Sequence, residues 1–245
     1  KTQQSYPLNL YLCRGCGLAQ LLYDMDVDAP LIQENELTSV SLGIVEHFRN
    51  YADETLGILN PPKESLVIDV GSNDGTLLKF FRDHGMRVLG VEAASIPAKA
   101  AVDAGVETIN QFFSSNLADD INSQHGQAAI VTANRIIANI HDLTDMIQGV
   151  RTLLAPDGVF IFETGRLVDL LDDLLFDTIY HEHLDYAAVK PLKLFFSRHD
   201  MELIDIKHFP VKGGSYRGIV QLAGGSRKVS PAVAEMLAHE ETLGI

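Results

Sequence analysis

The chain has 245 residues, of which 46% are hydrophobic and 21% are charged, a composition that excludes a disordered or fibrous protein. Its 33 acidic and 19 basic residues give a formal net charge of −14, which disfavours binding to nucleic acid or to an anionic membrane surface. The length suits one large α/β domain with a small appendage, and no apolar run reaches membrane-spanning length, so we expect a soluble cytoplasmic protein.

The first predicted unit, residues 1–25, is a short extended segment around Cys13 and Cys16. Two thiols separated by two residues, with glycines supplying the tight turn, are typical of one half of a zinc ribbon. A tetrahedral zinc needs two further ligands, and the sequence has no second pair of cysteines. Three interpretations stay open: a half-site completed by ligands upstream of Lys1, a redox pair, or two ordinary thiols. We favour the half-site, because a redox pair normally follows a strand and opens a helix.

Residues 26–63 are predicted to form a helical linker. Apolar residues recur at helical spacing between Leu37 and Phe48, and Pro61-Pro62 breaks the pattern. We expect a new domain to begin after this break and to extend over residues 64–228, with a helical tail over 229–245.

Apolar strands alternate with amphipathic helices in residues 64–228. This alternation predicts a doubly wound, mostly parallel sheet with helices on both faces. The last two strands differ, because Lys212-Gly213-Gly214-Ser215 joins them as an antiparallel hairpin. The predicted strands are 66–70, 88–92, 106–109, 128–132, 159–163, 203–211 and 216–222, and the predicted helices are 76–84, 96–104, 115–122 and 143–154.

A glycine loop follows the first of these strands. A loop between a strand and a helix places a ligand at the carboxyl edge of the sheet, and Gly71 and Gly75 let the backbone approach it closely. The spacing is neither the GxGxxG of dinucleotide sites nor the GK[ST] of nucleoside triphosphate sites, and the acidic Asp69 and Asp74 disfavour a pyrophosphate. S-adenosylmethionine, which is cationic and amino-acid-like, fits better, with Glu92 gripping the ribose hydroxyls.

The alternative is that neither feature binds a ligand: the GxxxG segment is then only a tight turn, and Glu92 is an acidic residue on the surface. We favour the cofactor site, since loop and acid stand at the ends of two successive strands. A terminal antiparallel hairpin after five βα units is also typical of class I methyltransferases rather than of dehydrogenases. The predicted cofactor-binding residues are Asp69, Gly71, Ser72, Asn73, Asp74, Gly75, Glu92, Phe112 and Asn134.

The segment Tyr180-His181-Glu182-His183 is the densest chemical cluster of the sequence. If it is extended, Tyr180 and Glu182 point to one side and the two histidines to the other. An imidazole can remove a proton from a carbon next to a carbonyl, a tyrosine hydroxyl can donate to the enolate oxygen, and a carboxylate can orient the imidazole. The alternatives are a metal site, disfavoured by the alternation of sides, and a surface loop without chemistry.

Four segments together resemble the zinc-containing sugar C-methyltransferases, which methylate carbon 3 of nucleotide-linked 4-keto-6-deoxy sugars. The matching segments are Tyr6-Pro7-Leu8 with Cys13–Leu18, Gly71–Leu78, Phe176–His183 and Gly213–Arg217. The resemblance implies that His183 is the general base and that Tyr180 and Glu182 are its active-site companions. It further implies that His181 and Arg217 lie on the substrate side, that Cys13 and Cys16 are zinc ligands, and that Gly71–Gly75 and Glu92 hold the methyl donor.

The sequence departs from this family at several positions. These departures bear on the identity of the substrate and leave the binding of the methyl donor unaffected. The first cysteine pair is absent, and Asn139 stands where the family usually has a histidine. Lys212 stands where the family has the histidine of its His-Gly-Gly-Ser segment. The family also has an active-site tyrosine in the helical linker, and this chain has no counterpart of it around Glu34–Ser39. The family's second Rossmann-like domain would begin where this chain stops.

We therefore predict an S-adenosylmethionine-dependent C-methyltransferase acting on the carbon α to a ketone. The expected partner is a small-molecule substrate, a nucleotide-linked keto sugar, and zinc is a candidate second cofactor. The alternatives are O- or N-methylation of another small molecule and a non-catalytic cofactor-binding partner subunit. A nicotinamide dehydrogenase is disfavoured by the loop spacing and the terminal hairpin.

Overall fold

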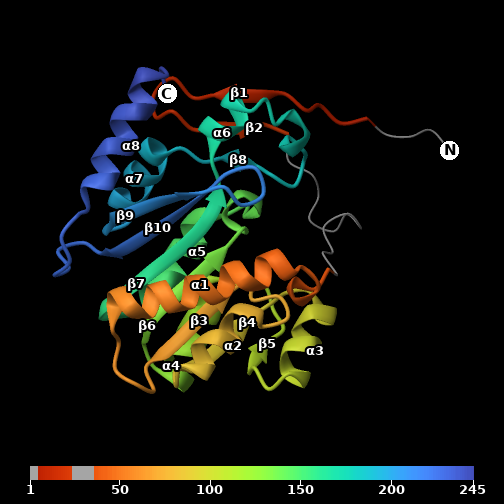
Figure 1. Ribbon diagram of the computed structural model, residues 1–245, viewed down its shortest axis with the longest axis vertical. Helices are drawn as coiled ribbons and strands as arrows, with labels where there is room; N and C mark the ends of the chain where they lie inside the picture. The colour runs from red at the N-terminus through yellow and green to blue at the C-terminus, as the bar shows by residue number, and fades with distance from the viewer. Residues whose placement is uncertain (1–4, 24–35) are drawn as a thin grey trace. The chain divides into compact units, whose positions relative to one another are not determined.

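The computed structural model (Figure 1) describes residues 5–23 and 36–245. It divides into two compact units, between which the chain passes several times. The first unit comprises Lys1–Ile32, Arg135–Leu143 and Phe162–Ile245, and the second comprises Gln33–Asn134 and Thr144–Ile161. The domain boundaries expected near residues 25, 63 and 228 stay a prediction. Within the described part of the chain, no helix combines the length and the apolar character needed to cross a membrane.

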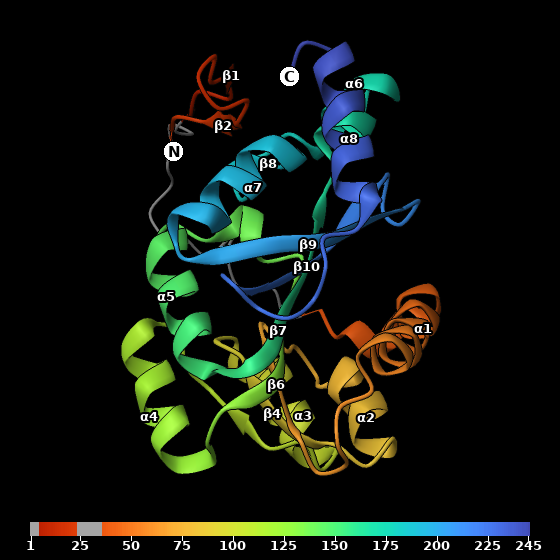
Figure 2. The ribbon, with the colours of Figure 1, turned by 90° about the vertical axis from the view of Figure 1, so that its left-hand side faces the viewer.

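The second unit contains a parallel sheet with helices on both faces. Its strands follow the order β5-β4-β3-β6-β7, and β3 pairs in parallel with both β4 and β6. Helices α1 and α2 cover one face and α4 and α5 the other (Figure 2). The elements are η2 (Thr38–Val40), α1 (Leu42–Leu59), β3 (Leu66–Val70), α2 (Thr76–Asp83), β4 (Arg87–Val91), α3 (Ser95–Asp103), β5 (Thr108–Ile109), α4 (Ser115–His125), β6 (Ala128–Asn134), α5 (Leu143–Leu153) and β7 (Leu154–Gly165).

Burial on both faces explains the sequence of the central strand. All five residues of β3 are buried, so the strand reads as a continuous apolar run rather than as an alternating one. Helix α1 packs beside α2 through Tyr51, whose ring meets Phe48 and Phe81 edge to face at centroid distances of 6.3 and 6.5 Å. The linker helix therefore belongs to the core of this unit.

The first unit holds the end of β7, the terminal hairpin and a small separate sheet. The order is β7-β10-β9, with β9 and β10 antiparallel, and a three-stranded sheet has the order β1-β2-β8. The elements are β1 (Leu10–Leu12), β2 (Ala19–Leu21), η3 (Ile137–Asn139), α6 (Leu167–Asp172), η4 (Phe176–Thr178), β8 (Asp185–Tyr186), α7 (Val189–Arg198), β9 (Met201–Phe209), β10 (Ser215–Leu222) and α8 (Pro231–Thr242).

The structure confirms the expected class I methyltransferase architecture. The alternation of strands and helices and the terminal antiparallel hairpin are both present. The sequence did not predict helices α6 and α7 or the short sheet of β1, β2 and β8. The helical pattern expected from residue 26 is observed as α1, and its part in residues 26–35 lies outside the described residues.

Candidate functional site

The loop between β3 and α2 turns its backbone N–H groups toward other protein atoms. Gly71 and Gly75 adopt positive φ angles of 73° and 72°, which only glycine reaches without strain. The donors and acceptors are Gly71 N and Ser72 N to Val91 O, Asn73 N to Glu92 Oε2, Asp74 N to Asn73 Oδ1, and Gly75 N to Ser72 O. Because each of these N–H groups already donates within the protein, the loop is not arranged to cradle a pyrophosphate.

Glu92, the residue after β4, has its carboxylate fixed by the backbone. Its Oε2 accepts from Asn73 N at 2.9 Å and its Oε1 from Ala94 N at 2.7 Å. Each carboxylate oxygen has a second acceptor position, so the group can still accept from two vicinal hydroxyls. This geometry fits the predicted role on a ribose.

Two of the predicted cofactor-binding side chains are hydrogen-bonded to the linker. Asn73 Oδ1 accepts from Thr38 N at 2.9 Å, and its Nδ2 donates to Glu36 O at 3.0 Å. Asp74 Oδ2 accepts from Ser39 N at 2.9 Å. These side chains therefore fasten the segment around η2 to the glycine loop, a contact that loop spacing alone could not reveal.

Asp69, near the carboxyl end of β3, carries a buried carboxyl group. The side chain accepts from Thr132 Oγ1 at 2.6 Å, and the residue is 4% exposed. Burial raises the pKa of Asp69 to about 7; the hydrogen bond from Thr132 opposes this shift, and the negative charge of Glu92 adds to it. A large fraction of Asp69 is consequently protonated near neutral pH.

Polar atoms without partners lie at the same carboxyl ends of the strands. Ser72 Oγ and both amide atoms of Asn134 are buried and have no hydrogen-bond partner among the described residues. Buried polar groups are nearly always hydrogen-bonded, so these atoms fit a site that a polar ligand completes. Phe112, which follows β5, is 79% exposed, and its ring offers a face for stacking.

The segment Tyr180–His183 forms a turn, which differs from the extended conformation considered above. His183 N donates to Tyr180 O at 3.0 Å, closing a turn over His181 and Glu182. Tyr180 and His183 therefore lie on one side rather than on opposite sides, with Tyr180 Oη 2.9 Å from His183 Nε2 and ring centroids 4.1 Å apart. The alternation rule fails here because a turn breaks it.

The hydrogen bonds of His183 define which ring nitrogen is basic. Nδ1 lies 3.1 Å from Thr178 O, and because a carbonyl only accepts, Nδ1 carries the hydrogen in the neutral ring. Nε2 is then left with a lone pair and accepts from the Tyr180 hydroxyl. A backbone carbonyl thus helps to orient the imidazole, and the expected contribution of a carboxylate stays a prediction.

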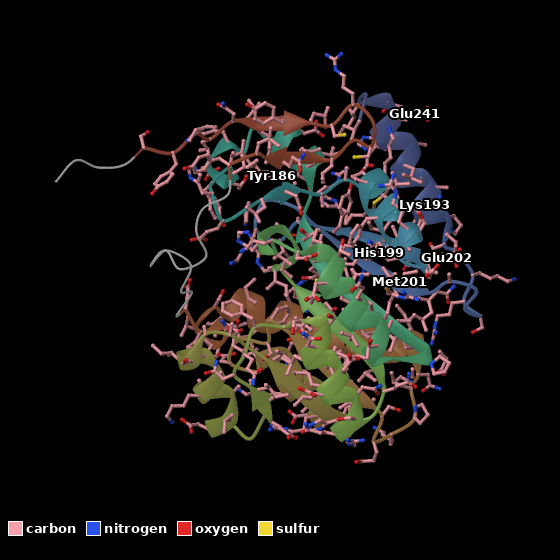
Figure 3. All side chains as sticks on the ribbon, turned by 180° about the vertical axis from the view of Figure 1, so that it is seen from behind. Tyr186, Lys193, His199, Met201, Glu202 and Glu241 are labelled. Atoms are coloured by element: carbon pink, nitrogen blue, oxygen red, sulfur yellow. The ribbon has the colours of Figure 1, made fainter. Side chains whose placement is uncertain are left out.

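Tyr186 of β8, which is labelled in Figure 3, packs against the same imidazole. Its ring meets that of His183 edge to face at 6.1 Å, and its hydroxyl is 3.5 Å from Thr178 O. Burial raises the pKa of Tyr186 to about 12, so its hydroxyl keeps its hydrogen. Sequence reasoning missed Thr178 and Tyr186, because one acts through its backbone and the other through packing.

Both residues predicted to face the substrate have partners within the first unit. His181 Nε2 is 2.9 Å from Pro7 O. Arg217 is 6% exposed, and its Nε and Nη2 both lie 2.7 Å from Glu163 Oε1 while its guanidinium packs 4.5 Å from the centroid of Phe209. Arg217 is therefore part of a buried ion pair, and the substrate role of both residues stays a prediction.

Cys13 and Cys16 lie in the connection between β1 and β2. Backbone N–H groups of Cys16 and Gly15, followed by the Cys16 thiol, lower the pKa of Cys13, as expected for a thiol prepared to act as a thiolate. Both cysteines are free. Residues 5–23 and 36–245 contain no cluster of three or more His, Cys, Asp or Glu side chains suited to a metal ion.

Comparison with known proteins agrees with the fold. Residues 45–206 match the family described as "Methyltransferase domain". The chain belongs to this family. The C-methyltransferase NovU of Streptomyces niveus is 37% identical over 240 residues, which make up 98% of this methyltransferase chain and 57% of NovU. The chain thus spans little more than half the length of this relative.

Solved methyltransferases share the fold at low sequence identity. Magnesium protoporphyrin IX methyltransferase (ChlM) from Synechocystis PCC 6803, solved with bound SAH, aligns with a TM-score of 0.56 and 12% identity over 75% of this chain and 84% of ChlM. The CurJ carbon methyltransferase aligns with a TM-score of 0.55 and 14% identity over 76% of this chain and 57% of CurJ. The chain therefore has the fold of S-adenosylmethionine-dependent methyltransferases.

Proposed function

We propose that this methyltransferase domain transfers a methyl group from S-adenosylmethionine to the carbon next to a ketone, in a nucleotide-linked keto sugar. The observation that carries the proposal is the pair formed by Tyr180 and His183, in which Nε2 of the imidazole is the basic atom and a phenol lies 2.9 Å away. The 37% identity to a C-methyltransferase supports carbon as the methylated atom. The sugar rests on the resemblance of the four sequence segments.

We infer that the methyl donor binds in the second unit, at the carboxyl ends of β3, β4 and β6. Glu92 accepts the ribose hydroxyls, and Ser72 and Asn134 supply the polar atoms that have no partner in residues 5–23 and 36–245. Asp69 and the exposed ring of Phe112 border the same strand ends. When bound, S-adenosylmethionine supplies an electrophilic methyl group on a positively charged sulfur.

In the proposed reaction, the Tyr180 hydroxyl turns from His183 Nε2 to the ketone oxygen of the substrate, and Nε2 then uses its lone pair to remove a proton from the carbon next to the ketone. The C–H electron pair becomes the enolate, and Nε2 becomes protonated. Tyr180, whose hydroxyl no longer has an acceptor on the imidazole, donates to the enolate oxygen. The enolate carbon then forms a bond to the methyl group as the sulfur–methyl bond breaks, and the sulfur leaves as a neutral thioether. General base catalysis of this kind contributes about 10²–10⁴-fold to a rate.

Solvent-deuterium exchange into the substrate tests the base separately from methyl transfer. We expect the wild-type protein to exchange the hydrogen next to the ketone of a nucleotide-linked 4-keto-6-deoxyhexose. With isotopically labelled S-adenosylmethionine, mass spectrometry should then show one added methyl group on carbon. His183→Asn should lower both rates by about 10²–10⁴-fold, and Tyr180→Phe should lower them less.

His125→Asn, on α4, is the matched control and should leave both rates unchanged. Methylation of a hydroxyl or an amine without deuterium exchange would contradict carbon as the acceptor. Wild-type rates in His183→Asn would remove the imidazole from the mechanism. Absence of exchange and of methylation across a panel of keto sugars would favour a non-catalytic binding subunit.

We further propose that Cys13 and Cys16 supply two of the four ligands of a structural zinc. The N–H groups directed at the Cys13 thiol favour its thiolate form, which is the form that binds zinc. Metal analysis of the purified protein should find zinc, and the double variant Cys13→Ser with Cys16→Ser should lose it. Equal zinc contents in the two proteins would contradict the assignment.

A further inference from the structure

Asn139 lies on η3, a short helix that the backbone fastens to the turn carrying His183. Leu184 N donates to Ala138 O at 2.6 Å. In the chain, Ala138 comes directly before Asn139, and Leu184 comes directly after His183. Backbone bond lengths then limit the distance between the Cα atoms of Asn139 and His183 to at most about 9.5 Å. A substrate of the size of one sugar ring can therefore reach both side chains.

The amide oxygen of Asn139 is buried and has no hydrogen-bond partner among the described residues. An acceptor of this kind costs free energy when it stays unpaired in a protein interior. Most buried polar side-chain atoms are paired, so an unpaired one beside the proposed base calls for a partner outside the described part of the chain. The missing partner must be a hydrogen-bond donor, because an amide oxygen only accepts.

The rest of the side chain allows such a partner to reach the oxygen. Asn139 as a residue is only partly buried. Its terminal amide turns about a broad, nearly two-fold torsion, and this rotation moves the oxygen to the position of the amide nitrogen. A donor on a bound molecule can thus meet the oxygen without a change in the backbone of η3.

We propose that Asn139 is a substrate-binding residue whose amide oxygen accepts a hydrogen bond from a hydroxyl group of the substrate, near the carbon deprotonated by His183. This inference rests on the function proposed above and makes it narrower. It restricts the substrate to ketones that carry a hydroxyl group. It also makes one side chain responsible for distinguishing such a substrate from analogues that lack this hydroxyl. A site built to pair with a hydroxyl rejects an analogue that lacks it, since the protein group is then left unpaired.

Equilibrium binding tests the assignment without depending on catalysis. The probes are a nucleotide-linked 4-keto-6-deoxyhexose and two analogues that each lack one ring hydroxyl, titrated calorimetrically into the wild-type protein, Asn139→Leu and the control Asn116→Leu on α4. We expect wild type and Asn116→Leu to bind the parent sugar at least tenfold more tightly than one of the analogues. In Asn139→Leu the affinity for the parent should fall at least tenfold, to the level of that analogue.

Thermal unfolding separates this role from a structural one. Leucine has nearly the shape of asparagine and removes an unpaired acceptor, so we expect Asn139→Leu to melt at or above the wild-type temperature while it loses affinity. An equal loss of affinity for all three probes, or no loss for any, would overturn the assignment of Asn139 and leave the proposed function standing. Failure of the wild-type protein to bind any of the three probes would instead refute the keto-sugar substrate, and the role of Asn139 with it.

Discussion

At the scale of single residues, Asp69 shows how one buried carboxyl group couples the site to pH. The group is 4% exposed, and burial is the main cause that raises its pKa from 3.8 to about 7. The folded state therefore holds a proton that the unfolded state releases. This contribution to stability is complete below the unfolded pKa near 4 and is lost as the pH rises through about 7.

Asp69→Asn should remove this dependence on pH. The asparagine side chain resembles the protonated acid and keeps an oxygen for the hydrogen bond from Thr132. We expect the free energy of unfolding of Asp69→Asn, relative to the wild type, to increase between pH 4 and pH 8 by up to about 4 kcal/mol. Urea denaturation at a series of pH values measures it, with Asp119→Asn on the surface of α4 as the control. A difference that stays constant with pH, as in the control, would contradict the raised pKa.

At the scale of elements, the sequence predicted best where burial alone decides the structure. The strand at Leu66–Val70 has the predicted bounds. All five of its residues are buried, and a short continuous apolar run of this kind can be recognised from the sequence alone. The turn at Tyr180–His183 was not predictable in this way, since a single backbone hydrogen bond sets the side on which each side chain lies. The orientation of His183 likewise depends on Thr178 O, an atom that every residue type supplies.

Helix α7 escaped prediction because its N-terminal cap comes from a distant part of the chain. Its own N-cap residue, Ala188, makes no side-chain hydrogen bond. Glu240 of α8, which is 1% exposed, accepts instead from Val189 N at 2.7 Å and from Lys190 N at 3.1 Å. The same carboxylate accepts from Tyr216 Oη at 3.0 Å. A negative charge at a helix N-terminus also interacts favourably with the helix dipole.

Glu240→Ala should therefore destabilise the protein, whereas Glu241→Ala should not. The first substitution leaves two N–H groups and one buried hydroxyl without their acceptor, at an expected cost of about 2–4 kcal/mol in the free energy of unfolding. Glu241, the next residue on the same helix (Figure 3), is exposed, and its replacement should change stability by less than about 0.5 kcal/mol. Urea denaturation of both variants provides the measurement. Equal stability of the two would show that the cap of α7 contributes nothing.

At the scale of the whole molecule, the proposed activities belong to different units. The residues proposed to bind the methyl donor lie in the second unit, and the proposed base and Asn139 lie in the first. The donor site could be predicted from the sequence because successive parallel strands bring their carboxyl ends to one edge, and it stays a prediction. The base is predicted only through resemblance, since the strand pattern carries no information on the turn that holds it.

This division predicts that variants of the two units separate binding from catalysis. A ligand at 100 times its dissociation constant stabilises the folded state by about 2.7 kcal/mol, which for a chain of this size raises the melting temperature by about 5–10 °C. S-adenosylhomocysteine should produce such a shift in the wild type and in His183→Asn, and NAD should produce none. Ser72→Ala should reduce the shift without lowering the melting temperature of the free protein, because Ser72 Oγ has no partner among the described residues. Ser123→Ala, on the surface of α4, is the control, and a full shift in Ser72→Ala would exclude Ser72 Oγ from the donor site.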